Sequence, residues 1–191
     1  MSTLTEDQQA LRALLLKKSV MQGDFTLASG AKSDLYVDCR LTTMDAEGAC
    51  LVGKVLHAVA WQAEQELGVT PTSVGGLTMG ADPLALAIAM TSHLSGDASP
   101  IHAFSVRKEA KGHGRKKLVE GNFKDGDTVI VVDDVITTGG STLQAIEKVE
   151  AEGGKVAFVV VLVDREEGGR ANIEAKGYKV FSAYTRTSLL S

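Results

Sequence analysis

The stretch Val129-Ile-Val-Val-Asp-Asp-Val-Ile-Thr-Thr-Gly-Gly-Ser-Thr142 decides how this chain folds. It starts as a run of β-branched residues, which is typical of a strand that is covered on both faces of a sheet. Two acids follow, then a turn rich in hydroxyl groups and glycine. A helix is predicted next, over Thr142 to Glu152, with Gly153 as its stop. A strand that leads through a short turn into a helix is the repeating unit of parallel α/β folds.

The same alternation of strands and helices continues on both sides of this stretch. The expected strands are Ser73–Gly76, Ile101–Val106, Thr128–Val132, Val156–Val163 and Tyr178–Ala183, and the further expected helices are Leu84–His93 and Ala171–Ala175. Asp82-Pro83 is expected to cap and open the first of these helices. Because that helix is apolar on nearly all sides, it is expected to be buried. The order of elements predicts a parallel α/β sheet with right-handed crossovers.

The N-terminal part of the chain has a less regular pattern. Thr5 and Gln8 form a capping box that predicts a helix ending at Gly23, and short extended pieces are expected around Phe25–Leu27 and Leu35–Val37. An amphipathic helix is predicted from about Asp45 to Leu67, with Gly68 as its C-terminal cap. We expect a single domain over residues 1–191, in which residues 1–42 form a small cap over one end of the sheet.

Composition narrows the classes of function. The formal net charge is −4, so the surface as a whole does not favour nucleic acid as a partner. The longest apolar runs, Leu84–Met90 and Val156–Val163, are far too short to span a bilayer. The polar, acidic N-terminus lacks the pattern of a targeting segment. Cys39 and Cys50 match no close metal-ligand spacing. These features favour a globular protein of a cytoplasmic, reducing compartment.

The turn that follows the strand at Val129 has the chemistry of a phosphate site. Ligands of open parallel sheets bind beyond the carboxyl ends of the strands. We expect a phosphate to bind at the start of the helix, where the helix dipole favours negative charge. The residues expected to present backbone amides and hydroxyls there are Thr137, Thr138, Gly139, Gly140, Ser141 and Thr142. Asp133 and Asp134 would repel phosphate, but they suit the vicinal hydroxyls of a ribose and the positive charge that develops on a reacting sugar. Capping and turning alone would explain each pair of residues but not the whole ordered run.

A basic segment, Arg107 to Lys117, stands out in this acidic chain. It holds six cations and one acid, with Gly112 and Gly114 inside it. One interpretation is a solvated surface loop that touches RNA, although interleaved aromatic residues for base stacking are missing. The other is an electrostatic clamp for a diphosphate group, which would also keep water away from a cation-like transition state.

The segment from Asp133 to Ser141 resembles the phosphoribosyl diphosphate signature of type I phosphoribosyltransferases. Arg107-Lys-Glu-Ala-Lys-Gly-His-Gly114 resembles the catalytic loop of one branch, the orotate phosphoribosyltransferases. The resemblance extends from about Phe25 to Ala183. It implies the type I fold with an N-terminal hood over the base site, and transfer of a phosphoribosyl group to N1 of orotate in pyrimidine biosynthesis. It also implies a donor used as its Mg²⁺ complex, without direct protein ligands to the metal, and a homodimer in which the 107–117 loop reaches the neighbouring site.

The resemblance also implies roles for individual residues. Asp133 and Asp134 would hold the ribose hydroxyls, and Thr137 to Ser141 would hold the 5′-phosphate. Contacts to the diphosphate would come from Arg107, Lys108, Lys111 and His113, with Lys111 as the main stabiliser of the leaving group. Phe25–Asp38 resembles the family's orotate segment, in which Tyr36 would pack beside the base, and Asp164–Gly168 resembles a strand ending in which Arg165 would pair with the orotate carboxylate. The alternative interpretations are that Tyr36 is an aromatic residue of a small core and that Arg165 is only a charge at the end of a strand.

Two departures from the family pattern concern lysines. Many relatives carry a lysine where this chain has Ala28, and another within a loop that here reads Gly76-Leu-Thr-Met-Gly-Ala-Asp-Pro83. Lys32 is one candidate replacement, and the backbone amides of Thr78 to Ala81 are another. Two alternative functions also stay open. A purine phosphoribosyltransferase would leave Arg165 unexplained, and a non-catalytic sensor of phosphoribosyl diphosphate would need a nucleic-acid-binding module that the sequence does not display.

Overall fold

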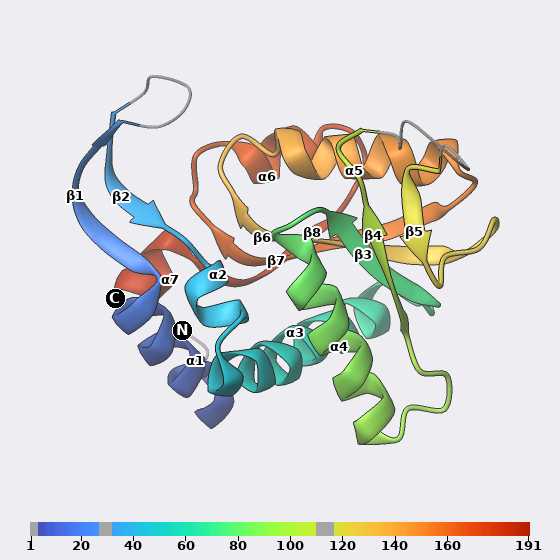
Figure 1. Ribbon diagram of the computed structural model, residues 1–191, viewed down its shortest axis with the longest axis horizontal. Coiled ribbons are helices and arrows are strands. Elements are labelled where there is room, and N and C mark those ends of the chain that lie inside the picture. The colour runs from blue at the N-terminus through green and yellow to red at the C-terminus, as the bar shows by residue number, and fades with distance from the viewer. Residues whose placement is uncertain (1–3, 27–31, 110–116) are drawn as a thin grey trace.

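The computed structural model describes residues 4–26, 32–109 and 117–191, and its centre is a six-stranded sheet in the order β5-β4-β3-β6-β7-β8 (Figure 1). The strands are β3 (Ser73–Leu77), β4 (His102–Val106), β5 (Val119–Gly121), β6 (Thr128–Ile136), β7 (Lys155–Asp164) and β8 (Val180–Thr185). Neighbouring strands run parallel, apart from the antiparallel pair of β4 and β5. The predicted parallel α/β fold is therefore confirmed.

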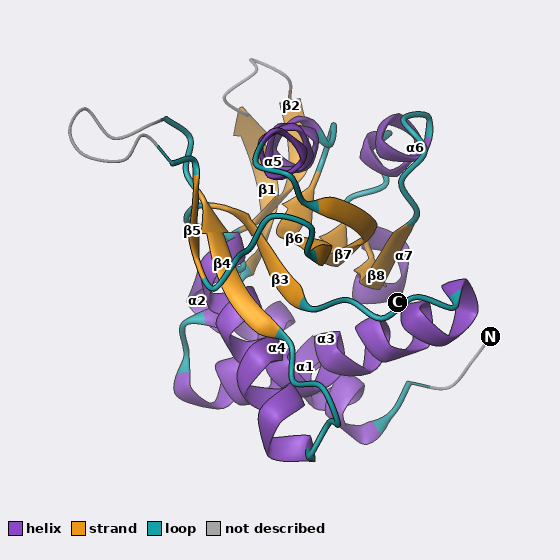
Figure 2. Ribbon diagram, turned by 90° about the vertical axis from the view of Figure 1, so that its right-hand side faces the viewer, coloured by secondary structure: helices purple, strands orange, loops and turns teal. Residues whose placement is uncertain are grey.

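Helices cover both faces of the sheet, as Figure 2 shows. One face packs against α1 (Glu6–Lys18), α3 (Ala46–Leu67) and α4 (Ala81–Ser95), and the other against α5 (Gly140–Ala151) and α6 (Gly169–Glu174). Two shorter helices, α2 (Arg40–Thr43) and α7 (Arg186–Leu190), complete the set seen in the described residues. In this same part of the chain, no helix combines the length and the hydrophobicity that crossing a membrane requires.

The alternating side chains of the central strands build the core on both sides of the sheet. In β6, Ile130 and Val132 belong to the cluster under α3 and α4, whereas Val129 and Val131 belong to the cluster under α5. All four are at most 1% exposed. Because successive strand residues point to opposite faces, a continuous β-branched run buries itself only when both faces are covered. This is why the sequence near Val129 predicted the layered fold correctly.

The long helix α3 begins and ends at the predicted caps. The Asp45 carboxylate accepts a hydrogen bond from the Gly48 amide at 3.1 Å, and Gly68 closes the helix at φ 64°. In its middle, Gly53 lets α3 approach α4 so closely that a methyl group there would meet the side chain of Thr91 and the carbonyl of Ala87. The close approach makes α3 and α4 a single packed layer.

The N-terminal region differs from its prediction. The first helix ends at Lys18 rather than Gly23, because Val20 starts β1 (Val20–Thr26), which pairs antiparallel with β2 (Lys32–Val37). The pairing of Val20 with Val37 competes successfully with helical periodicity, as tertiary contacts often do. The resulting hairpin stands apart from the main sheet, as Figure 1 shows.

The end of β6 also differs from its prediction. The strand does not stop at Val132 but runs through both acids to Ile136, because β7 continues to pair with it as far as Asp164. The following helix starts at Gly140 rather than Thr142. The two acids are therefore part of the sheet, which fixes their backbone more firmly than a loop would.

The start and the exposure of α4 were predicted wrongly. The helix begins at Ala81 with Gly80 as its N-cap, so Asp82 lies inside the first turn, where its carboxylate accepts a hydrogen bond from Ser105 Oγ at 2.6 Å. The helix is buried on one face only. Leu86, Met90 and Leu94, which recur every fourth residue, are 58%, 63% and 79% exposed. An apolar helix need not be enclosed within its own chain.

Replacing Gly53 by alanine is expected to lower the free energy of unfolding by about 1–3 kcal/mol, the usual penalty of overpacking. The added methyl group would lie 2.7 Å from the Ala87 carbonyl oxygen. Thermal and urea unfolding followed by circular dichroism would measure the change. Gly140→Ala is the matched control, because an added methyl group there would approach no atom outside its immediate surroundings closer than Thr138 Oγ1 at 3.9 Å, and a tolerated exchange of this kind is neutral or stabilising. A Gly53→Ala protein as stable as the parent would contradict the packing argument.

Candidate active site

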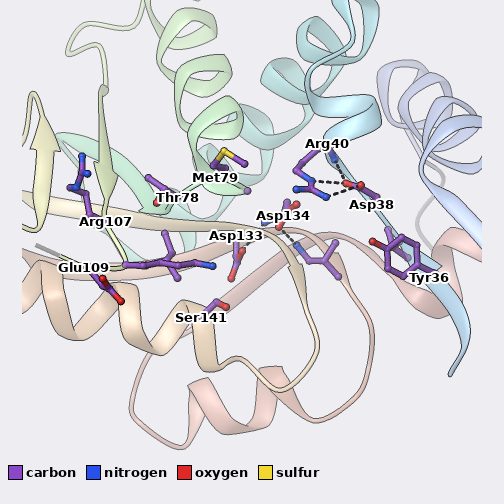
Figure 3. Close-up of a pocket in the computed structure, with 15 residues that line it drawn as sticks. Tyr36, Asp38, Arg40, Thr78, Met79, Arg107, Glu109, Asp133, Asp134 and Ser141 are labelled. Atoms are coloured by element: carbon purple, nitrogen blue, oxygen red, sulfur yellow. Dashed lines mark hydrogen bonds and ion pairs between the residues drawn. The ribbon is translucent and has the colours of Figure 1, made fainter. Parts of the chain in front are cut away.

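A pocket of about 800 Å³ opens at the carboxyl ends of β3, β4 and β6 (Figure 3). Its walls come from the end of β2, the loop after β3, the residues that follow β4, the acids of β6 and the first turn of α5. Of the residues predicted for the site, the pocket brings together Tyr36, Arg107, Lys108, Asp133, Asp134 and Ser141. The position matches the rule that ligands of open parallel sheets bind beyond the carboxyl ends of strands.

The two acids at the floor of the pocket are held by hydrogen bonds. Asp133 accepts from Thr142 Oγ1 at 2.7 Å and from the Asp134 amide at 3.1 Å, and Asp134 accepts from the Val135 amide at 3.0 Å. Burial raises the pKa of Asp133 to about 7, and burial also raises the pKa of Asp134. The Thr142 hydroxyl, which was expected to face a phosphate, donates its hydrogen bond to Asp133 instead. Groups that donate hydrogen bonds to these carboxyls, such as ribose hydroxyls, would favour their ionised forms.

The predicted phosphate turn connects β6 with α5. Gly139 adopts φ 81°, and a side chain there would meet the carbonyl oxygen of Gly169 at 3.0 Å, so glycine allows the turn to pack tightly. The Asn172 side chain donates to the Thr138 carbonyl at 3.0 Å and fixes the turn from α6. Ser141, in the first turn of α5, lines the pocket, whereas Thr137, Thr138, Gly139 and Gly140 lie next to it without forming its described wall.

The wall that carries the basic residues is anchored to α5. The Lys148 ammonium donates to the carbonyl oxygens of Arg107 at 2.9 Å and Lys108 at 2.6 Å. Just before β5, the Leu118 amide donates to a Glu152 carboxylate oxygen at 3.2 Å. Lys111 and His113 lie outside the described residues. Helix α5 therefore supports both the phosphate turn and the base of the basic segment.

The side of the pocket predicted to hold the base is formed by β2. Tyr36 is 37% exposed, and its ring centroid lies 5.6 Å from that of Phe25. Figure 3 shows Tyr36 and Arg107 at opposite sides of the two acids. Lys32 lies in β2, and its side chain is outside the description. Arg165 follows β7, is 3% exposed and pairs with Glu167 at 2.6 Å, and it is not among the residues that line the pocket.

Several lining residues had no individual role predicted from the sequence, although most lie within segments that were predicted to belong to the site. They are Val37, Asp38, Arg40, Leu77, Glu109 and Val135, and of these Arg40 lies outside every predicted segment. Arg40 and Asp38 form a bidentate ion pair, with nitrogen–oxygen distances of 2.8 and 2.9 Å. The sequence contained a signal for this pair, namely an acid and an arginine two residues apart immediately after a predicted strand.

Comparisons with known proteins agree with this geometry. The phosphoribosyl transferase domain family matches residues 52–186. The chain is 42% identical to the orotate phosphoribosyltransferase of Rhodopirellula baltica, over 91% of this chain and 89% of the relative. It is also 42% identical to that of Aquifex aeolicus, over 96% and 98%. A crystal structure of Mycobacterium tuberculosis orotate phosphoribosyltransferase in complex with 5-phospho-α-D-ribosyl 1-diphosphate superposes with a TM-score of 0.75 at 35% identity, covering 97% of this chain and 99% of that one.

The fold and the site thus define a phosphoribosyltransferase of type I. Within that class, the chain belongs to the orotate phosphoribosyltransferase family.

Asp133→Asn is expected to stabilise the ligand-free protein at about pH 8 by up to a few kcal/mol, since each tenfold change in proton affinity corresponds to about 1.4 kcal/mol. Burial raises the pKa of Asp133 above the ordinary value of 3.8. The stability of the folded protein is therefore unaffected by this carboxyl below pH 3.8, where the group is protonated in both states, and it falls as the pH rises from there through about 7. Asparagine, which does not ionise, removes this loss. The gain should shrink toward pH 5. Thermal unfolding across this range measures it, with the exposed Asp24→Asn as control. An equal gain at both pH values would contradict this explanation.

Proposed function

We propose that this chain transfers the 5-phosphoribosyl group of phosphoribosyl diphosphate to N1 of orotate. The products are orotidine 5′-monophosphate and diphosphate, and the reaction serves pyrimidine biosynthesis. The observation that carries the proposal is the arrangement of the pocket, in which the buried Asp133 and the partly buried Asp134 lie between Arg107 and Tyr36 (Figure 3). The identity of the acceptor base is inferred from the family of the chain, because its relatives are named orotate phosphoribosyltransferases.

The ribose phosphate half of the donor would occupy the floor of the pocket. Asp133 and Asp134 would accept hydrogen bonds from the ribose hydroxyls, for which two adjacent carboxylates are well suited. The 5′-phosphate would bind at the start of α5, where unpaired amides and the helix dipole favour a dianion. The residues proposed to hold it are Thr137, Thr138, Gly139, Gly140 and Ser141.

The diphosphate leaving group would be bound by the basic segment. Arg107 and Lys108 line the pocket, and Lys148 holds the backbone carbonyls of both residues. We assign Lys111 and His113 to the same group by their places in the motif, with Lys111 as the main stabiliser of the leaving diphosphate and as its proton donor. These cations act on charge that grows as the bond to C1 of the sugar breaks, and this is where electrostatic stabilisation lowers a barrier.

Orotate would enter on the side of β2. Tyr36 is 37% exposed, so a flat base could pack against its ring. Arg165 would pair with the orotate carboxylate, because a buried carboxylate needs a cation and a guanidinium can bind it through two parallel hydrogen bonds. Arg165 now pairs with Glu167, which is 31% exposed, so orotate would share or replace that partner.

Chemically, little activation of the acceptor is required because orotate is already an anion. The protein's own contribution would be support of the cation-like sugar by Asp133 and Asp134, together with neutralisation of the leaving group. Phosphoribosyltransferases that use this donor generally need a divalent metal. We propose Mg²⁺, which prefers oxygen ligands and would be bound through the donor's own oxygens rather than by direct protein ligands, and which when bound would neutralise diphosphate charge. The described residues contain no cluster of three or more His, Cys, Asp or Glu side chains that would hold a metal by itself.

A homodimer is the proposed assembly, with the 107–117 segment reaching the neighbouring pocket. The exposed stripe of Leu86, Met90 and Leu94 on α4 supports this proposal, because contiguous apolar surface of this kind marks interaction sites. Helix α4 follows directly on the 78–80 loop of the pocket, so a partner on α4 would lie near the site. For location we propose the cytoplasm, where thiols such as those of Cys39 and Cys50 persist.

Loss of orotate absorbance in the presence of phosphoribosyl diphosphate and Mg²⁺ tests the proposed reaction. We expect turnover with orotate and none with adenine or hypoxanthine. Lys111→Ala should reduce kcat by about 100-fold or more, as is usual when a transition-state contact is removed. Turnover only with a purine would show that the base was assigned wrongly. Donor binding without any turnover would favour a sensor of phosphoribosyl diphosphate.

The proposed dimer is tested by light scattering coupled to size-exclusion chromatography. The double variant Met90→Lys with Leu94→Lys is expected to be a folded monomer, because burying two unpaired ammonium groups opposes association. Trp61→Lys is the control, since Trp61 is 57% exposed on α3 and outside the stripe. A parent protein that is monomeric, or a double variant that stays dimeric, would contradict the assignment of this surface.

A further inference from the structure

The bidentate pair of Arg40 and Asp38 lies at the wall of the pocket, away from the basic segment. Arg40 is the first residue of α2, and Asp38 follows β2. Nε and Nη2 of Arg40 donate to the two carboxylate oxygens of Asp38, and the Arg40 amide donates to Asp38 Oδ1 at 3.1 Å. Within the described part of the chain, no hydrogen bond engages Nη1 of Arg40, whose side chain stays 47% exposed. The pair therefore fixes the direction of the guanidinium and still leaves a donor for a ligand.

Arg40 lies near the loop that follows β3. Arg40 and Met79 line the main pocket, and they also line a neighbouring hollow of about 530 Å³. In Figure 3 the guanidinium points from α2 toward Asp134, on the far side of Met79 from Arg107. Gly80 packs so close to Asp134 that an added methyl group would lie 2.5 Å from the carboxylate. The loop over residues 78–80 thus has Arg40 on one side and Arg107 on the other.

The composition of the loop after β3 explains why a cation would be needed at the position of Arg40. The 76–83 loop contains no lysine. The part of this loop that lines the pocket, residues 78–80, is neutral, so it offers amides to a polyanion but no positive charge. Among the described residues, the cations that line the pocket are Arg40, Arg107 and Lys108, and only Arg40 comes from the side of α2.

We propose that Arg40 is a substrate-binding residue that contacts the diphosphate of the donor from the wall opposite Arg107, and that it supplies the charge which the lysine-free 76–83 loop lacks. The inference rests on the proposed donor. The single free guanidinium nitrogen would donate to a diphosphate oxygen, while Asp38 holds the other two nitrogens in place. Charge-assisted hydrogen bonds from a preoriented arginine lose little side-chain entropy on binding.

The competing explanation is structural. Asp38 accepts the Arg40 amide, so the pair also closes the turn into α2. A purely structural pair would affect stability and leave the affinity for a free anion unchanged. If Arg40 contacted the base instead of the diphosphate, its replacement would change only the KM for orotate. These three roles separate experimentally because inorganic diphosphate contains neither the sugar nor the base.

The experiment uses the full chain with Mg²⁺ and compares Arg40→Met and Arg40→Lys with the parent. Calorimetry would measure the affinity for inorganic diphosphate and for phosphoribosyl diphosphate, and steady-state assays would give KM for each substrate. Lys54→Met is the matched control, because Lys54 also forms an ion pair but lies on α3, outside the residues that line the pocket. Thermal unfolding of each variant accompanies the binding data.

For Arg40→Met we expect the affinity for both ligands to fall by roughly 10- to 100-fold, the usual effect of removing a charged hydrogen bond. KM for the donor should rise in parallel, and KM for orotate should change less than about twofold. Arg40→Lys, which keeps the charge, should lie in between, and Lys54→Met should bind like the parent. A variant with parental affinity for diphosphate, or one whose defect is confined to orotate, would overturn the proposal.

The outcomes also separate this inference from the proposed function. A parent protein that binds neither ligand and does not consume orotate would overturn both. A parent protein that turns over orotate, together with an Arg40→Met variant that binds diphosphate equally well, would overturn only the role of Arg40.

Discussion

The parallel pairing of β6 with β7 is the constraint on which the site depends. The ladder continues beyond the apolar run to the pair Ile136–Asp164, so both acids are held as strand residues near the carboxyl end of the central strand β6. The same pairing places Arg165, the residue after β7, beside the start of the predicted phosphate turn, since the Arg165 amide donates to the Ile136 carbonyl at 3.0 Å. Groups proposed to bind the sugar, the 5′-phosphate and the base are therefore positioned by a single set of backbone hydrogen bonds. Backbone pairing of this kind is rigid, which suits a site whose chemistry is mainly positioning and electrostatics.

Burial of charge is the second physical theme of the site. Removing Asp133 and Asp134 from water raises the pKa of both groups, and the Thr142 hydroxyl offsets part of that effect for Asp133. We expect a ligand that donates hydrogen bonds to these two carboxyls to offset part of the cost of burying them. Helix α5 extends this coupling across the pocket. Its first turn follows the phosphate turn, whereas Lys148, two turns later, holds the backbone of Arg107 and Lys108.

The parts of the fold that the sequence predicted well are those in which local and tertiary preferences agree. The β-branched runs of β6 and β7 have one stable environment, and α3 carries both a capping aspartate and a terminal glycine. Prediction failed where a contact distant in sequence decided the outcome. Val20 joined a strand because Val37 was available to pair with it, and Asp82 bonded to Ser105 rather than capping its own helix. The apolar stripe on α4 misled the burial prediction for a similar reason, because periodicity shows that a surface is apolar but not which molecule covers it.

The candidate site shows the same division between contiguous and assembled features. A motif is visible in a sequence when one segment supplies all its groups, as the stretch from Asp133 to Ser141 does. Arg40 and Asp38 join the pocket only because β2 leaves the N-terminal hairpin beside the carboxyl end of β6, where the Cys39 thiol lies 3.8 Å from the Asp134 carbonyl oxygen. A loop without lysine is compatible with a charged ligand if the fold brings a cation to it from elsewhere. The charge that a ligand meets is thus a property of the assembled pocket, and a missing residue in one motif does not by itself remove the function that the motif serves.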